Sequence, residues 1–303
     1  MATLKGQNLR VILNSDEDYE CVGMATNCTI NLTANTDDAS TKDDTGMASK
    51  PTVNSRTGQV NVESLSVADV AAILTAIKEQ TPFLLVWDET TANVNKNQDP
   101  EGATFSRKAK AILNDVTFAF NDRENATKSL QFTLISQPVA AGSISTQATG
   151  AQSYTKGQFV RLFLGSDNTA VPAKVIAAAK TLQVHVSVQL EDATTKDTDG
   201  TFQVQEVTGI SYDITSNALV RSGDVITSSV QGQDLASIES IHESESPVKF
   251  QIANVSGANQ RTKGSVLMSG SVIVSSLSIN AANRQNATYD VTLTGYGDYT
   301  VGA

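Results

Sequence analysis

The sequence predicts a mainly β protein made of two tandem antiparallel β-sandwich or partial-barrel modules, each with one flanking α-helix. Three observations lead to this fold class. Hydrophobic residues make up 40% of the 303 residues and aromatic residues only 5%, so the apolar content is mostly Val, Ile, Leu and Ala among many Thr and Ser. Short alternating stretches recur in both halves, and each half has one stretch with helical spacing. Finally, the polar segment 38–46 has a near copy at 192–200.

Strand patterns fill most of the first half. Residues 9–13 and 21–25 flank an acidic tip and predict a hairpin. Apolar and polar residues alternate over 26–34, which predicts a strand with one solvent-facing side. The repeated polar segment then predicts a long loop over 38–55. Further strands are expected at 59–65, 83–87, 109–113, 116–120 and 130–135.

One helix and one linker complete the first half. Apolar residues recur at helical spacing after Ser66, a suitable N-cap, and Pro82 ends the pattern, so residues 66–79 predict an amphipathic helix. Residues 139–153 are rich in Ala, Gly, Ser, Thr and Gln, a composition typical of a flexible linker. We therefore expect a first module at 1–138, a linker at 139–153 and a second module at 154–303.

The second half repeats the order of the first. Lys156-Gly157-Gln158 matches Lys5-Gly6-Gln7, and residues 284–288 copy 123–127 just before a closing strand. Asp234 is a suitable N-cap for a helix that ends before Pro247. Three matched landmarks in the same order predict an internal duplication. Strands are expected at 159–164, 181–190, 209–214, 248–252 and 291–294.

The charge of the chain limits its partners. The formal net charge is −10, and both halves carry more acidic than basic residues. Such a surface repels phosphates, so we expect neither tight DNA binding nor attachment to an anionic membrane, whereas DNA could move past it without sticking. Residues 1–6 begin no apolar core of signal length, and no run reaches the ~20 apolar residues of a membrane span. Synthesis in the cytoplasm is therefore expected.

The side chains offer little chemistry. Thr195, Asp197, Asp199 and Glu206 approach the spacing of a calcium loop, but Thr replaces the first Asp and neither flank has a helical pattern, so a solvated turn explains them more simply.

The residues that most often serve in catalysis or redox chemistry are few. Cys21 and Cys28 form no CxxC motif and are expected to be reduced thiols. His185 and His242 are isolated and suggest no catalytic arrangement. We expect no enzyme activity, metal or cofactor.

Taken in order, the landmarks resemble a known family. A Lys-Gly opening leads into a strand, followed by Cys-Thr-Ile-Asn-Leu at 28–32, Asp-x-Ser-Thr-Lys-Asp at 38–43, a long loop, a strand, a single helix and a closing hairpin. This order resembles the major tail tube proteins of long-tailed bacteriophages, over nearly the whole chain and once per module.

The resemblance implies the phage tail tube fold, in which six modules form a ring and rings stack into a tube that conducts DNA during ejection. Family members often carry one module per chain. Two modules here would make the ring a homotrimer with pseudo-sixfold symmetry, with a homohexamer as the alternative. The resemblance further implies a place in the virion tail, the tape measure, tail terminator and distal tail proteins as partners, genomic DNA only in transit, and no membrane insertion.

The same resemblance implies that the repeated loop contacts the adjacent ring. The charged residues expected at this contact are Asp38, Lys42, Asp43, Asp44, Asp192, Lys196, Asp197 and Asp199.

A geometric estimate supports six modules. If each module contributes about four strands to a closed barrel, ~24 strands spaced ~4.7 Å apart and tilted ~40° give a diameter of roughly 47 Å, wide enough for duplex DNA. Three modules would give about 23 Å, which is too narrow. Two alternatives remain: a tube protein of a contractile injection or type VI-like system, and a tandem-sandwich carbohydrate-binding or adhesion protein. The second would need exposed aromatic platforms, and the chain has a single Trp, Trp87.

Overall fold

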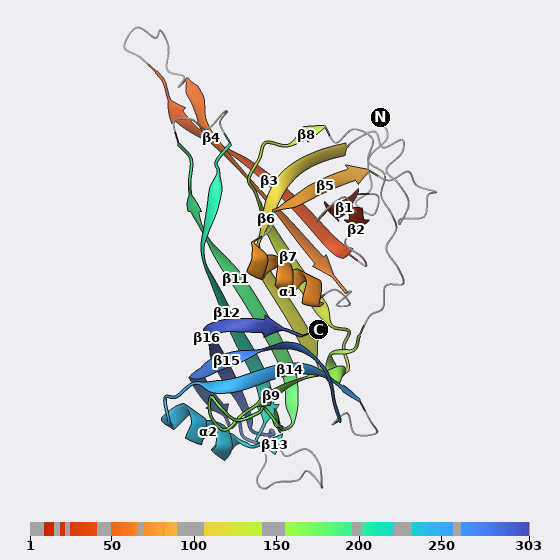
Figure 1. Ribbon diagram of the computed structural model, residues 1–303, viewed down its shortest axis with the longest axis vertical. Coiled ribbons are helices and arrows are strands. Elements are labelled where there is room, and N and C mark those ends of the chain that lie inside the picture. Colours follow the sequence, from red (N-terminus) through yellow and green to blue (C-terminus); the bar gives the residue numbers. More distant parts are fainter. Residues whose placement is uncertain are drawn as a thin grey trace.

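The fold is mainly β, as predicted (Figure 1). The computed structural model describes residues 9–14, 19–21, 25–40, 50–65, 70–80, 82–89, 106–140, 155–195, 202–220, 232–256 and 262–302. The elements of the first half are β1 (Leu9–Asn14), β2 (Tyr19–Cys21), β3 (Ala25–Asp38), β4 (Pro51–Ser64), α1 (Val70–Glu79), β5 (Phe83–Glu89), β6 (Ser106–Asn121), β7 (Thr127–Leu134) and β8 (Val139–Ala140). Those of the second half are the 3-10 turn η2 (Gly157–Phe159), β9 (Val160–Leu164), β10 (Lys174–Ile176), β11 (Ala179–Asp192), β12 (Gln205–Leu219), β13 (Gly232–Gln233), α2 (Leu235–Glu243), β14 (Val248–Ser256), β15 (Thr262–Asn280) and β16 (Thr288–Val301).

The two halves pair their strands in the same order. In the first half the order is β2-β1-β5-β6-β7-β4-β3, and in the second it is β10-β9-β14-β15-β16-β12-β11. The irregularities also agree. A register shift lies at Asn35/Thr36 in the β3–β4 pair and at Gln189/Leu190 in the β11–β12 pair. This agreement assigns each strand residue of one half a counterpart in the other.

The halves are joined into one 16-stranded sheet by β6 and β11. These strands pair antiparallel, from Thr181 opposite Asn121 to Ser187 opposite Asp115. A continuous path, β3-β4-β7-β6-β11-β12-β16-β15, therefore runs through both halves. Along its central strands the burial pattern alternates, with one face packed on the core and the other polar. Figure 1 shows the long β3–β4 and β11–β12 hairpins extending beyond the body as two arms.

The two helices cover apolar strand surface. Asp234 caps α2 as predicted, its side chain accepting a hydrogen bond from the Ser237 amide at 2.9 Å. Helix α1 contacts β15 and β16 of the other half. There the Tyr299 hydroxyl donates to the Leu74 carbonyl at 2.8 Å, and the Lys78 ammonium donates to the Tyr299 carbonyl at 2.9 Å. The proposed cap of α1, Ser66, lies outside the described residues.

Four features differ from the sequence-based expectation. The long strand β15 was not predicted, because Ser and Gly interrupt its apolar pattern. The two strands expected over 109–120 are the single strand β6, with a register shift between Leu113 and Asp115 that breaks the alternation. The loop expected over 38–55 is shorter, since β4 already begins at Pro51 and pairs with Asp38. Finally, Val139 and Ala140, assigned to the linker, pair with β6 as β8.

At equivalent places in the two cores, a glycine faces a bulky side chain, but the strand that carries the glycine differs between the halves. Gly58 and Leu134 directly follow the last pair of the β4–β7 ladder, Gln59 and Thr133, and a Cβ on Gly58 would lie 2.6 Å from Leu134 Cδ1. In the β12–β16 ladder the large residue is on the other strand: Tyr212 fills the space, and a Cβ on Gly295 would lie 2.6 Å from its ring. Each half is therefore packed around one bulky side chain and one glycine.

This exchange predicts a coupled pair of substitutions. Gly295→Leu should lower the free energy of unfolding by about 1–3 kcal/mol, because the new side chain overlaps the Tyr212 ring. Adding Tyr212→Gly should recover part of the loss by recreating the Gly58–Leu134 arrangement. Urea unfolding of the single and double variants measures the coupling, and strictly additive effects would contradict it.

Candidate assembly interface

The charged loop residues expected at an inter-ring contact divide into two groups. Asp38 and Asp192 lie at the ends of β3 and β11, where each arm leaves its regular strand pairing. The other six, Lys42, Asp43, Asp44, Lys196, Asp197 and Asp199, lie outside the described residues. Their part in an inter-ring contact stays a prediction.

Asp38 and Asp192 form the same turn in both arms. The Asp192 carboxylate accepts hydrogen bonds from the Thr194 amide, at 2.9 Å, and from its hydroxyl. That hydroxyl in turn accepts from the Val204 amide across the hairpin at 3.1 Å. Asp38 accepts from the Ser40 amide and hydroxyl in the same way, and the hydroxyl accepts from the Lys50 amide at 3.0 Å. The repeated sequence is thus a side-chain cap that closes each arm where its strands end.

The cap depends on ionised carboxylates. Hydrogen bonds from the side chain and then the backbone of Ser40 lower the pKa of Asp38, and those from Thr194 lower the pKa of Asp192. Both carboxylates are fully exposed to solvent. They therefore remain charged at the arm ends at neutral pH.

The β6–β11 junction buries apolar side chains on its core side. Val186 lies opposite Val116, and Val184 opposite Phe118. All four are at most 2% exposed. This burial stabilises the sheet between the halves beyond its backbone hydrogen bonds.

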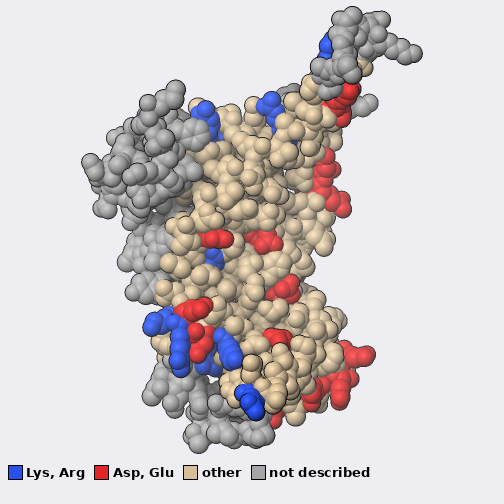
Figure 2. Space-filling view, turned by 180° about the vertical axis from the view of Figure 1, so that it is seen from behind, with Lys and Arg blue, Asp and Glu red and all other residues tan. Residues whose placement is uncertain are grey.

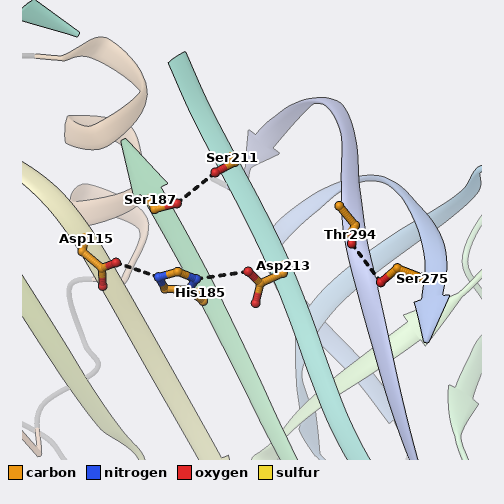
Figure 3. Close-up of polar contacts among 7 residues, drawn as sticks. All are labelled: Asp115, His185, Ser187, Ser211, Asp213, Ser275 and Thr294. Carbon is orange, nitrogen blue, oxygen red and sulfur yellow. Dashed lines mark hydrogen bonds and ion pairs between the residues drawn. The ribbon is translucent and has the colours of Figure 1, made fainter. Parts of the chain in front are cut away.

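On its polar side the junction is bridged by a histidine (Figure 3). His185 Nε2 lies 2.7 Å from an Asp115 carboxylate oxygen on β6, and Nδ1 lies 3.1 Å from an Asp213 carboxylate oxygen on β12. Partial burial of the ring lowers the pKa of His185, but the hydrogen bonds and charges of Asp115 and Asp213 outweigh it and hold the pKa above its ordinary value. A protonated His185 therefore ties three adjacent strands together.

Both ends of the strand path carry open edges. Within the described residues, β3 pairs with β4 alone, and the end of β15 from Ser276 to Asn280 pairs with β16 alone. These edges expose apolar side chains: Leu32 on β3 is 57% exposed, and Ile279 on β15 is 52% exposed. Unpaired strand edges with exposed apolar residues favour pairing with another chain.

The open edges correspond to the two strands of the closed junction. Position for position, Leu32 is the counterpart of Val186, which is fully buried, and Ile279 is the counterpart of Phe118, which is 1% exposed. The same positions are thus covered inside the chain and uncovered at its two ends. This correspondence was not found from the sequence, although the alternation of Cys28, Ile30 and Leu32 matches that of Leu182, Val184 and Val186.

From β4 to β16, level with the β6–β11 junction, the polar face of the strand path carries no Lys or Arg among the described residues. It instead carries Ser, Thr, Asn and Gln, together with the carboxylates Glu63, Asp115, Asp213 and Asp290. Among the described residues of this region, His185 is the side chain that can become a cation. Farther along β6, Lys110 lies on the same face, because Ile112 is opposite Thr133 and side chains alternate along a strand.

The remaining candidates have modest roles. Cys28 is half-buried, and this burial raises its thiol pKa to about 11, so the thiolate is scarce. The structure describes Tyr19–Cys21 as β2 but not the Cys21 side chain. Asp197 and Asp199 of the possible calcium loop lie outside the described residues, and the described part contains no cluster of three metal-ligating side chains. Trp87 is 3% exposed and provides no aromatic platform for a carbohydrate. No helix within the described ranges is long and apolar enough to span a membrane.

Comparisons with known proteins give the following matches. No protein-family model matches the chain, and no curated protein matches its sequence. Among solved structures, the tail of an empty gene transfer agent (GTA) particle with C6 symmetry matches at a TM-score of 0.38 and 14% identity, over 49% of this chain and 99% of that chain. The virion of the native gene transfer agent particle matches at 0.36 and 13%, over 49% and 99%. The SPP1 tail tube matches at 0.37 and 15%, over 48% and 78%. Each match spans about half of this chain.

The His185 bridge predicts a pH-dependent junction. Because the pKa is raised in the folded state, the stabilisation is fully present below the unfolded value of about 6.5 and is lost as pH rises through the folded value. At this partly exposed site we expect no more than about 1 kcal/mol. Unfolding of the single chain at pH 6 and pH 8 should show the difference, and His185→Gln should remove it while His242→Gln should not. Equal pH dependence in both variants would contradict the bridge.

The repeated cap predicts local fraying of the arms. Asp192→Ala removes the acceptor for the Thr194 amide and hydroxyl, so the amides of Ala193 and Val204 should exchange hydrogen severalfold faster. Because folding lowers the pKa, the wild-type protection should be present above the ordinary Asp value and fall as pH drops through the folded value. Asp38→Ala should have the same effect at Ala39 and Lys50 only. Hydrogen exchange with mass spectrometry tests both arms, and unchanged rates would refute the cap.

Proposed function

We propose that this chain is a structural subunit of a phage tail tube, which assembles with copies of itself into rings that stack into a conduit for DNA. The observation that carries the proposal is the match between the open edges and the internal junction. In the strand order of the first half, β3 occupies the place that β11 occupies in the second half. Likewise, β15 occupies in the second half the place that β6 occupies in the first. A second copy can therefore continue the sheet through contacts of the same kind as those between β6 and β11.

The register of this pairing follows from the internal one. In the β6–β11 ladder, His185 lies opposite Thr117. Their counterparts are Asn31 on β3 and Ser278 on β15, which would lie opposite each other between two copies. On the core side, Leu32 and Ile279 would then be covered as Val186 and Phe118 are.

A head-to-tail contact of this kind closes into a ring or continues as a helix. If copies are related to each other as the two halves of one chain are, each copy supplies two of the six modules of a ring. The ring then contains three chains and has pseudo-sixfold symmetry. Closure removes every open edge of the strand path. A ring of six chains is the alternative.

The polar face of the strand path suits the lining of a DNA conduit. In the closed ring its hydroxyl, amide and carboxylate groups would surround the lumen. Carboxylates repel phosphates, and level with the β6–β11 junction the described part of the face has no Lys or Arg that would hold the backbone. DNA would therefore pass without binding, and the arms capped by Asp38 and Asp192 would reach the neighbouring ring.

Disrupting the two edges tests the assembly. Electron microscopy of the purified protein at high concentration should show hollow tubes of stacked rings, and Leu32→Asp with Ile279→Asp should abolish them without unfolding the chain, because charges would be buried in the new ladder. Val171→Asp, at a side chain 75% exposed away from both edges, is the control. Wild-type protein that stays dispersed at every concentration would overturn the proposal.

A disulfide measures the register in the same experiment. With Cys21→Ala and Cys28→Ala as background, Asn31→Cys with Ser278→Cys should link copies covalently, since directly opposed residues approach within disulfide range. Asn31→Cys with Asn280→Cys is displaced along the strand and should link poorly. The mass of the linked ring distinguishes three chains from six.

A further inference from the structure

Among the described residues, no helix contacts the place on the first half that is equivalent to the α1 contact on the second half. On the second half, Tyr299 at this contact is 3% exposed, and the paired residues Met268 and Ile252 are 1% and 2% exposed. Ile252 lies opposite Met268 in the β14–β15 ladder, as Trp87 lies opposite Arg107 in the β5–β6 ladder.

The first half has a hollow where the second half is filled. Pro138 follows Leu134 at the separation by which Tyr299 follows Gly295, and it is thus the counterpart of Tyr299. A cavity of about 450 Å³ lies here. Its lining includes Leu32, Arg56, Trp87, Arg107, Pro138 and Phe202.

The helices correspond residue by residue. Each is followed by a residue with positive φ, Gln80 at 55° and Glu245 at 50°, just before Pro82 and Pro247. Counting back from these residues, Glu239 takes the place of Leu74 and Glu243 the place of Lys78, the two residues through which α1 bonds Tyr299. Glu239 and Glu243 are one turn apart and share a face of α2.

We propose that α2 of one copy docks through Glu239 and Glu243 into the hollow beside Arg56 and Arg107 of the next copy. This inference rests on the proposed ring. If neighbouring copies are related as the two halves of one chain are, α2 lies against the first half of the next copy in the way that α1 lies against the second half of its own chain. The opposite charges of the two surfaces favour α2 of a neighbouring copy as the segment that fills the hollow.

The proposed contact between copies is charged, whereas the equivalent contact within the chain is largely apolar. Inside the chain, Leu74 and Lys78 contact Tyr299, and the buried Met268 lies opposite Val301, two residues beyond Tyr299. Between chains, two carboxylates meet two guanidinium groups, since Arg107 is the counterpart of Met268 and Arg56 that of Ile210. Figure 2 shows acidic side chains gathered on the side of the lower end where α2 lies, a mixed group of basic and acidic side chains on the other side of that end, and a few basic side chains at the opposite rim beside the arms. The two surfaces lie too far apart to meet within one copy (Figure 1).

The docking makes ring formation sensitive to salt. Exposed charge pairs weaken as ionic strength rises, whereas the apolar contact of α1 does not. Copies should therefore separate in high salt at the α2 contact while each chain keeps its own two halves together.

Charge exchange tests the docking. Glu239→Lys with Glu243→Lys should raise the protein concentration needed for assembly about tenfold, as expected for two surface ion pairs replaced by repulsion. Arg56→Glu with Arg107→Glu should act similarly, and the fourfold variant should restore assembly. Ser240→Lys, on the solvent side of α2, should assemble like the wild type. Sedimentation and electron microscopy measure assembly, and circular dichroism checks that each variant is folded.

Cross-linking gives a second readout. In the Arg107→Lys variant, a carbodiimide should join Glu239 or Glu243 to position 107, only between copies and only in assembled protein. Normal assembly of the Glu239→Lys, Glu243→Lys variant, together with no such cross-link in assembled protein that keeps both glutamates, would overturn the docking and leave the tube function standing. If wild-type protein forms no rings at all, the proposed function itself is wrong.

Discussion

The ladder between β6 and β11 is the interaction on which the rest of the structure depends. A strand edge presents a row of amides and carbonyls that must find partners, and burying them unpaired is costly. Within the chain this ladder satisfies the edges of both halves and buries Val116 and Phe118 against β11. The same edges at the two ends of the path stay open, with Leu32 and Ile279 exposed. One chain thus contains one completed junction, between β6 and β11, and two open edges, on β3 and β15, at the equivalent positions.

The two faces of the strand path differ in composition and in role. The core face holds the halves together through apolar packing, whereas the polar face carries almost only neutral polar groups and carboxylates. At the junction His185 is the exception, and it lies between Asp115 and Asp213, so its charge is balanced where it occurs. A face with this composition binds neither phosphate nor apolar surface strongly. It can line a passage without holding what passes.

Much of the fold could be predicted from the sequence, and what could not has physical reasons. The alternation of Leu182, Val184 and Val186 predicts β11, and Asp234 predicts the start of α2, because both signals are local. β15 escaped prediction since its end is exposed and rich in Ser, which removes the alternation that burial would impose. The bridge from His185 to Asp115 depends on the pairing of two strands far apart in sequence, and single-sequence patterns do not contain that register. The repeated Asp38 and Asp192 were found as a motif, but their role as caps needed the hydrogen bonds across each hairpin.

The covalent link between the halves gives a reason for the different chemistry of the internal junction and of the junction proposed between copies. Within one chain the second half is always near the first, at an effective concentration that makes even a modest contact form. Helix α1 can therefore use an apolar surface against Tyr299, which is never exposed on a folded copy. A contact between copies exists on free subunits before assembly, where an equally apolar surface would promote aggregation. In the proposed assembly, Glu239 and Glu243 in place of Leu74 and Lys78 would keep the surface of α2 polar until a copy with the complementary arginines arrives. The charged contact proposed between copies would thus differ from the permanent apolar contact within the chain.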